Sequence, residues 1–227
     1  MRAYTLAPMG IRTVRGDAVL LCVEPGGGEW RNANVAERIA AGAVVAEAAL
    51  RGAVSVDRDR LVPGTSGESA LARLAAEVAG KGKARKVSDW LGEVQDWALD
   101  AVVQELAAGG VARPAIGRKW GSHRQIGLEV LDPAAQERAA RTVREAAAET
   151  GNPTPDVTVV LLILAAAGEL RHVVPEAAVP LVSRWFTGPR LPVRRRLKQL
   201  REALPDGARA VLEAYAEAWR ATRDSEA

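Results

Sequence analysis

The chain has 227 residues and a formal net charge of +3, and 48% of its residues are hydrophobic. This hydrophobic share excludes an intrinsically disordered chain, and no apolar run is long enough to span a bilayer. The lone cysteine, Cys22, excludes an internal disulfide and a cysteine-rich metal site, and it favours a reducing cytosol. The segment Met1–Gly16 lacks the apolar centre of a signal peptide, so we expect no export.

Helical periodicity dominates the pattern along the chain. Alanine-rich or amphipathic stretches that stop at glycine or proline predict helices, and short β-branched stretches around turns predict hairpins. In chain order, the sequence predicts a helix over 34–51, a hairpin over 53–62, helices over 69–79 and 89–108, a hairpin over 111–131, and helices over 133–150, 157–170, 175–185, 192–204 and 208–223. The predicted fold class is mainly α: a single globular domain over 1–227, of all-helical type, with two small β-hairpins and an apolar central helix.

The central helix is the one over 157–170, which is apolar on all sides. It has about 14 residues, whereas a helix that crosses a bilayer needs about 20, so we expect it to be buried in the centre of the domain. Short polar side chains that can accept from free backbone N–H groups mark helix starts. The predicted caps are Asn32 or Asn34 for the first helix, Ser88 for the helix over 89–108, and Asp156 for the central helix.

Motifs of enzyme active sites and metal centres are missing from the sequence. His123 and His172 are far apart and lack helical metal-ligand spacing, and the sequence has no nucleophile elbow, zinc-protease motif or Cys–His pair. The glycine run Gly26–Gly28 is followed by Glu29 and Trp30 rather than by Lys and Ser or Thr, so it predicts a turn and not a phosphate loop. We therefore expect no catalytic activity, no metal site and no cofactor.

Positive charge and tryptophan are concentrated in three segments. Residues 184–201 carry seven cations and no acid, and the connector 81–86 and the predicted hairpin tip 118–124 are also basic. Each segment has Trp in or beside it. This combination is typical of a membrane–water interface, because indole prefers the headgroup layer and each cation adds about 1 kcal/mol near anionic lipid.

The tryptophans have different predicted environments. Trp90 and Trp97 lie seven residues apart on one helical face, and Trp219 follows the apolar stripe of the last helix, so all three are predicted in the core. Trp120 lies between a lysine and a glycine in the hairpin tip, where burial is difficult. It is the tryptophan predicted to contact a membrane or a partner.

Two further kinds of partner stay open. The helix and basic hairpin over 97–131 resemble a winged-helix unit, so the alternative function is a nucleic-acid-binding regulator. The helix over 89–108 carries five acids and no cation, which would repel phosphate, so nucleic acid is disfavoured as a partner. The segment Arg184–Arg201 could bind a protein partner, or its cations could pair with the acidic segment 202–227.

Six short segments follow one another in a characteristic order. They are AEAALRG (Ala46–Gly52), SGESALARL (Ser66–Leu74), VSDWL (Val87–Leu91), VVQELAAGGVA (Val102–Ala112), LDPAAQERAARTVREA (Leu131–Ala146) and NPTPDVTVVLLILAAAGEL (Asn152–Leu170). This series resembles the Golgi phosphoprotein 3 family over residues 17–187, with the helices of 188–227 beyond it. The resemblance implies a mostly helical domain with a protruding hairpin, no catalytic activity, and binding of phosphatidylinositol 4-phosphate at the cytosolic face of a membrane.

The resemblance also implies candidate residues for a lipid-headgroup site. The family's Trp before the first long helix aligns two residues from Trp30, and its helix Arg aligns with Ala41, one turn from Arg38. Its paired Arg positions align with Asp96 and Leu99, so the paired cations are missing. Trp30 and Arg38 are therefore the candidate headgroup residues, and recognition of phosphatidylinositol 4-phosphate itself stays open.

The hairpin keeps its place in the resemblance and supplies the candidate membrane contacts Arg118, Lys119, Trp120 and Arg124. The expected partner is an anionic phospholipid or a phosphoinositide. The chain has 26 Arg and five Lys and is rich in Ala and Gly, which suggests a GC-rich bacterial genome. The expected location is then the cytoplasm, at the inner face of the plasma membrane.

Overall fold

The computed structural model describes residues 13–26, 28–64, 70–119, 122–148, 153–174 and 192–226, without the side chains of 116–126, 192–194 and 223–226. The described helices are α1 (Val14–Leu20), α2 (Ala33–Leu50), α3 (Ala70–Gly80), α4 (Val87–Ala108), α5 (Pro133–Ala147), α6 (Pro155–Ala167), α7 (Leu170–Val173), α9 (Pro192–Glu202) and α10 (Asp206–Glu226). The described strands are β1 (Val54–Asp57), β2 (Arg60–Pro63), β3 (Arg85–Lys86), β4 (Ala112–Lys119) and β5 (Ser122–Val130). The predicted fold class, mainly α with small β-hairpins, is confirmed. The helix predicted over 175–185 lies outside the described residues.

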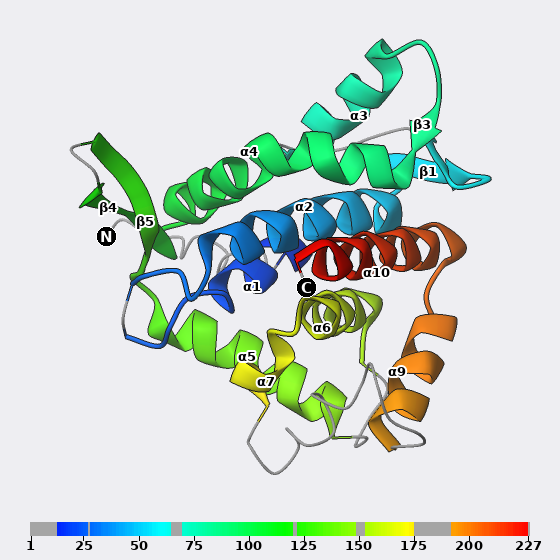
Figure 1. Cartoon of the computed structure of the whole chain (residues 1–227). Coiled ribbons are helices and arrows are strands. Elements are labelled where there is room, and N and C mark those ends of the chain that lie inside the picture. The colour runs from blue at the N-terminus through cyan, green and yellow to red at the C-terminus, as the bar shows by residue number, and fades with distance from the viewer. Residues whose placement is uncertain are drawn as a thin grey trace, which may run out of the picture.

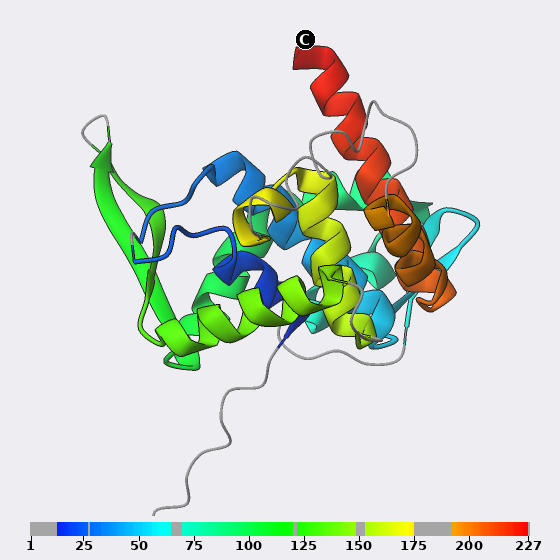
Figure 2. The same ribbon diagram turned by 90° about the horizontal axis from the view of Figure 1, so that it is seen from below.

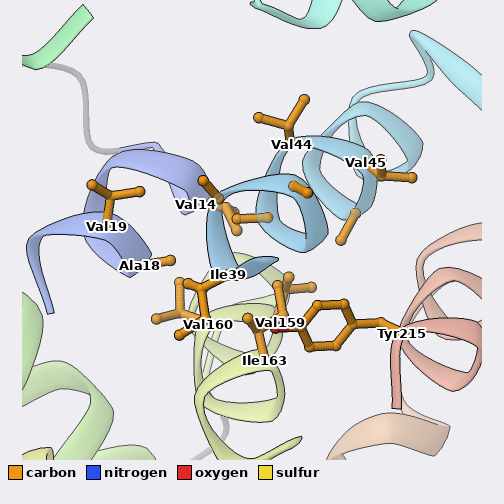
Figure 3. Packing of buried hydrophobic residues seen from close by; sticks show 14 of the residues in the cluster. Val14, Ala18, Val19, Ile39, Val44, Val45, Val159, Val160, Ile163 and Tyr215 are labelled. Atoms are coloured by element: carbon orange, nitrogen blue, oxygen red, sulfur yellow. The ribbon is translucent and has the colours of Figure 1, made fainter. Parts of the chain in front are cut away.

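The core is built around α2 and α6, which lie in the middle of the molecule (Figure 1). All residues from Thr158 to Ala166 of α6 are buried, as the sequence predicts for the central helix. Ile39 of α2 lies against the valines and isoleucine of α6, and Tyr215 of α10 reaches the same layer (Figure 3). Among the described helices, none combines the length and apolar character needed to cross a membrane.

Two antiparallel sheets lie at opposite ends of the molecule (Figure 1). The first is the predicted hairpin of β1 and β2, to which the short strand β3 adds a third member. The second is the hairpin of β4 and β5, paired from Ala112 with Val130 to Lys119 with Ser122, so its strands are longer than the sequence predicts. This hairpin stands away from the helical body, on the same side as the C-terminal end of α10 (Figure 2).

The helix α1 was not among the elements that the sequence predicts. Its periodic apolar pattern is interrupted by Arg15 and Asp17, which hides it in the sequence. Thr13 caps the helix, because its hydroxyl accepts a hydrogen bond of 3.0 Å from the backbone N–H of Gly16. The buried Arg15 pairs with carboxylates of α2 and α4, so this charge belongs inside the fold.

Helix caps are partly as predicted. The Asn32 side chain accepts from the backbone N–H of Val35 and caps α2. The predicted Ser88 cap is wrong: α4 begins at Val87, whose N–H donates to the carbonyl oxygen of Asp59 at 2.9 Å. The turn between β1 and β2 therefore satisfies the first N–H of α4, and no side chain caps this helix.

The predicted Asp156 cap is also wrong. The hydroxyl of Thr154 caps α6 at the N–H of Val157, and Pro155 takes the first helical position, where the missing proline N–H costs nothing. The Asp156 carboxylate instead accepts from Arg51 at 2.8 Å and links the end of α2 to the start of α6.

Candidate functional site

A small cavity lies where α2, α4 and α10 meet. The three helices contact one another, and α2 lies between α4 and α10 (Figure 1). The cavity has a volume of about 190 Å³. The described residues that line it include one cation, Arg38, several neutral polar side chains, and neither Asp nor Glu. This lining suits an anion that also carries hydrogen-bonding groups.

Arg38 lies near the start of α2 and is half-buried. Its guanidinium carbon is 5.1 Å from the centroid of the Trp219 ring on α10. Such a cation–π contact contributes about 0.5–1 kcal/mol at a partly exposed site and orients the guanidinium group. Within the described part of the chain, no carboxylate lies within salt-bridge distance of Arg38. Its charge is therefore not neutralised by an ion pair there.

The wall on α10 is aromatic. The rings of Tyr215 and Trp219 meet edge to face, with centroids 6.3 Å apart. Tyr215 can approach α2 because residue 42 is glycine: a Cβ atom on Gly42 would lie 2.6 Å from the tyrosine ring. Both side chains are buried, and neither the Tyr215 hydroxyl nor the Trp219 indole nitrogen reaches a partner with hydrogen-bond geometry among the described residues. Burial raises the pKa of Tyr215, so its hydroxyl stays protonated.

The wall on α4 is mixed. Ser88 and Gln95 bring polar groups to the cavity, and Leu91 and Gly92 lie between them in the sequence. Spacings of three and four residues place these side chains on one face of the helix. Thr222 adds a hydroxyl from α10, and it donates to the carbonyl oxygen of Ala218 at 3.1 Å. The cavity thus has one charged group and a set of neutral hydrogen-bonding groups.

The positions that the resemblance assigns to further cations do not add charge here. Ala41 lines the cavity but carries no polar group. Leu99 is buried, and Asp96 lies in a separate groove between α3 and α4. The cavity therefore keeps a single positive charge.

Trp30 does not join Arg38 in this cavity. It is 9% exposed, belongs to the hydrophobic core, and forms an isolated antiparallel bridge with Val23. The same loop continues the second sheet, because the N–H of Leu128 on β5 donates to the carbonyl oxygen of Gly28 at 2.8 Å. Trp30 thus lies beside the base of the β4–β5 hairpin, while Trp219 is the tryptophan against Arg38.

The other candidate contacts lie at the far end of the hairpin. Arg118 is paired with His123 in the strand register, and Lys119 and Arg124 are in the adjacent pairs. Trp120 lies outside the described residues. The base of the hairpin is fixed by Arg113, which donates to both carboxylate oxygens of Glu129 at 2.7 and 2.9 Å. This hydrogen bonding holds the pKa of Glu129 below its ordinary value.

The basic connector before α4 packs against tryptophan and an acid. Lys81 and Arg85 lie over the ring of Trp90 at 5.9 and 5.7 Å, and both pair with Glu93. Arg73 of α3 lies 4.2 Å from the centroid of the Trp97 ring. The prediction that Trp90 and Trp97 are core residues is confirmed, and intramolecular contacts account for their cationic neighbours.

The basic helix α9 is partly neutralised by its own chain. Arg201 lies 3.8 Å from Glu213 of α10, and Lys198 lies 3.7 Å from Glu202. The apolar side of α9 is buried through Leu197 and Leu200. The pairing with the acidic C-terminal segment is thus present for Arg201, and a protein partner for the segment 184–201 stays a prediction.

Sequence reasoning missed the role of α10 in the cavity. The prediction that Trp219 is a core residue is confirmed, since it is 8% exposed, but its ring also contacts Arg38. The available signal was the spacing of Tyr215, Trp219 and Thr222, which places two aromatic rings and a hydroxyl on one helical face. The contact with Arg38 joins residues 181 positions apart, so local periodicity cannot indicate it.

Comparison with known proteins gives one finding about ancestry. A family model described as Golgi phosphoprotein 3 (GPP34) matches residues 16–222. No curated protein gives a significant match to the chain. Within the described residues, no group of three or more His, Cys, Asp or Glu side chains could hold a metal ion. Because the family model covers nearly the whole sequence, the chain belongs to the Golgi phosphoprotein 3 (GPP34) family.

Proposed function

We propose that this protein is a peripheral membrane protein that binds anionic phospholipid headgroups and acts by binding rather than by catalysis. The observation that carries the proposal is the cavity at Arg38, a cation without a carboxylate partner in the described chain, walled by Trp219 and Tyr215. An anionic headgroup would supply the missing negative charge. Membership of a family whose members bind a phosphoinositide supports the same class of ligand.

The β4–β5 hairpin supplies the second proposed contact. Three consecutive pairs of the strand register at its far end contain Arg124, Arg118 and Lys119, and each cation near an anionic surface adds about 1 kcal/mol. The hairpin and the C-terminal end of α10 project from the same side of the molecule (Figure 2), which would let both approach one membrane. The proposed location is the inner face of the plasma membrane.

Vesicle sedimentation tests this proposal. The protein is mixed at low salt with phosphatidylcholine vesicles, with and without an anionic lipid, and the pelleted fraction is measured. Pelleting is expected only with the anionic lipid. Arg38→Gln, and Lys119→Ala combined with Trp120→Ala, are each expected to weaken binding by about fivefold or more, since about 1 kcal/mol is lost for each cation.

Arg141→Gln is the matched control. Arg141 is an exposed cation on α5 that lies outside both the cavity and the hairpin. Its replacement by glutamine changes the net charge by the same amount as Arg38→Gln. If Arg141→Gln weakens binding as much as Arg38→Gln, net charge and not the cavity accounts for the interaction. Absence of pelleting with any anionic lipid would refute the proposed function.

No observation favours nucleic-acid binding over this proposal. The helix α4 buries its apolar side against α2 and exposes Asp89, Asp96 and Asp100. These acids would repel phosphates in a groove. A gel-shift titration across salt tests this alternative: a shift that falls steeply as salt rises would support it, and no shift, or one that salt does not change, would exclude it.

A further inference from the structure

We infer that the cavity between α2, α4 and α10 selects a singly charged phosphodiester that bears a small polyol, as in a phosphatidylglycerol-type headgroup, over a phosphomonoester. This inference rests on the proposed function, because it concerns the ligand of the same site. The inference is based on the number and kind of polar groups that line the cavity.

The charge of the cavity sets the charge of its ligand. Arg38 is its one cation among the described lining residues, and Trp219 already covers one side of the guanidinium group. A phosphodiester carries one negative charge, which one arginine offsets. A phosphomonoester carries about −1.5 to −2 at pH 7, so one arginine would leave part of its negative charge unpaired.

Among the described residues that line the cavity, none besides Arg38 carries a positive charge. Ala41 lines the cavity without a polar group, and Leu99, the next α4 residue on this face, is buried and apolar. Because burial raises the pKa of Tyr215, its hydroxyl stays neutral, and the aromatic wall adds no charge. The cavity thus differs from a site with paired arginines.

The neutral groups of the cavity suit hydroxyls. The indole nitrogen of Trp219 donates, and the hydroxyls of Tyr215 and Ser88 and the amide of Gln95 can both donate and accept. The Tyr215 hydroxyl and the Trp219 indole nitrogen are buried and interact with each other, but the contact lacks good hydrogen-bond geometry, and neither atom has another partner among the described residues. These two atoms are covered in the structure, so a ligand hydroxyl reaches them only after a small shift of the rings. An unpaired buried polar group costs about 1–3 kcal/mol, so such a contact would be stabilising.

Two features exclude other common headgroups. The described lining residues contain no carboxylate, and the Arg38 cation already lies against the Trp219 ring, so the ammonium group of an ethanolamine or choline headgroup would find no counter-charge and would be repelled by Arg38. The volume of about 190 Å³ is below the roughly 300–1,000 Å³ of sites for drug-sized ligands. A phosphate with a three-carbon polyol is therefore a better match than a larger ring with an additional phosphate.

A pair of soluble competitors tests the inference on the full chain. Binding to vesicles that contain phosphatidylglycerol is measured in the presence of glycerophosphoglycerol, a diester, or sn-glycerol 3-phosphate, a monoester of the same polyol. The diester is expected to displace the protein at a concentration about fivefold or more below that of the monoester. Vesicles with phosphatidylinositol 4-phosphate are expected to bind no more tightly than vesicles with phosphatidylinositol when the two are matched in total surface charge, which keeps the contribution of the hairpin cations equal.

A variant with a second cation in the cavity should shift the ligand preference in the opposite direction. Gln95 is half-buried at the cavity, and Gln95→Arg should shift the preference toward the monoester without unfolding the protein. Circular dichroism confirms that the variant is folded. Arg38→Gln should abolish displacement by both competitors, which shows that they act in the cavity.

The outcomes separate the two proposals. Tighter binding of the wild-type protein to the monoester, or to phosphatidylinositol 4-phosphate, overturns the inferred selectivity but leaves lipid binding in place. Anionic vesicles that bind without displacement by either competitor also overturn it, because the cavity is then not the site. Failure to bind any anionic vesicle overturns the proposed function itself.

Discussion

Arg15 is a buried charge that connects four helices. Its Nη1 lies 2.9 Å from a carboxylate oxygen of Glu47 on α2, and its Nε donates to Glu105 on α4 at 2.6 Å. The second oxygen of Glu105 accepts from the N–H of Ala70 at the start of α3. Burial lowers the pKa of Arg15, but the hydrogen bond with Glu105 and the charge of Glu47 outweigh this effect, so the pKa lies above its ordinary value. The group is charged, and its partners hold it in place.

Glu47→Gln tests the importance of this network. The side chains of Arg15 and Glu47 are only 8% and 3% exposed, so the substitution leaves a buried charge with one partner fewer. We expect the free energy of unfolding to fall by about 3 kcal/mol, the lower end of the range for broken buried pairs, because Glu105 remains. Urea denaturation followed by circular dichroism measures the change.

Glu77→Gln is the matched control for this prediction. It breaks the pair between Arg73 and Glu77, whose side chains are 51% and 32% exposed. Such pairs contribute about 0–1 kcal/mol. Equal losses in the two variants would show that the Arg15 network contributes no more than a surface ion pair.

The helix α10 approaches α2 closely at one residue, Gly42. A Cβ atom at this position would lie 2.6 and 2.7 Å from atoms of the Tyr215 ring, so Gly42→Ala must displace α10 or the ring. We expect a loss of about 1–3 kcal/mol from this overpacking, partly offset by the better helix propensity of alanine, about 0.5–1 kcal/mol. Lipid binding should weaken as well, because Tyr215 lines the cavity.

Gly92→Ala on α4 should have the opposite effect on stability. A Cβ atom on Gly92 would meet no atom within 4 Å, so only helix propensity changes. Stability should rise by about 0.5–1 kcal/mol. Thermal denaturation of the two variants shows whether each substitution raises or lowers the stability of the protein. A Gly42→Ala variant as stable as the wild-type protein would contradict the close packing of α2 and α10.

Most helices and both hairpins could be predicted from the sequence because their signals are local. Apolar periodicity and glycine or proline stops lie within each segment, and the Asn32 cap is three residues from its donor, the N–H of Val35. The start of α4 could not be predicted, because its first N–H, that of Val87, donates to the Asp59 carbonyl oxygen of a different element. Ser88, a good cap by type, is instead a cavity residue.

The candidate site was predictable only in part for the same reason. Arg38 was found through an alignment of one helix with the family pattern, and it lines the cavity. The sequence predicts that Trp30, which is close to Arg38 along the chain, shares its site. The fold instead brings Trp219 of the last helix to Arg38, and Trp30 pairs with Val23. Contacts between distant segments depend on how α2, α4 and α10 pack, which no local pattern encodes.

Across the described part of the molecule, nearly all buried apolar side chains belong to one hydrophobic cluster. It includes residues from α1 at Val14 to α10 at Trp219, and α6 crosses its centre. Elements that share one core lose stability together when any part of it is damaged. A defect in α6 should therefore be detectable at a distant position, and Cys22 provides the probe.

Cys22 follows α1 and is 3% exposed, and its Sγ lies 3.3 Å from the carbonyl oxygen of Ala18. Burial raises the pKa of this thiol, so the reactive thiolate forms only when the core opens. At pH 8 we expect iodoacetamide to label the native protein slowly and the urea-unfolded protein fast. Leu161→Ala, in the centre of α6, removes about 2–5 kcal/mol and should raise the labelling rate by more than about tenfold, as mass spectrometry can measure. Rapid labelling of the wild-type protein, or no increase in the α6 variant, would mean that the region around Cys22 opens independently of the central helix.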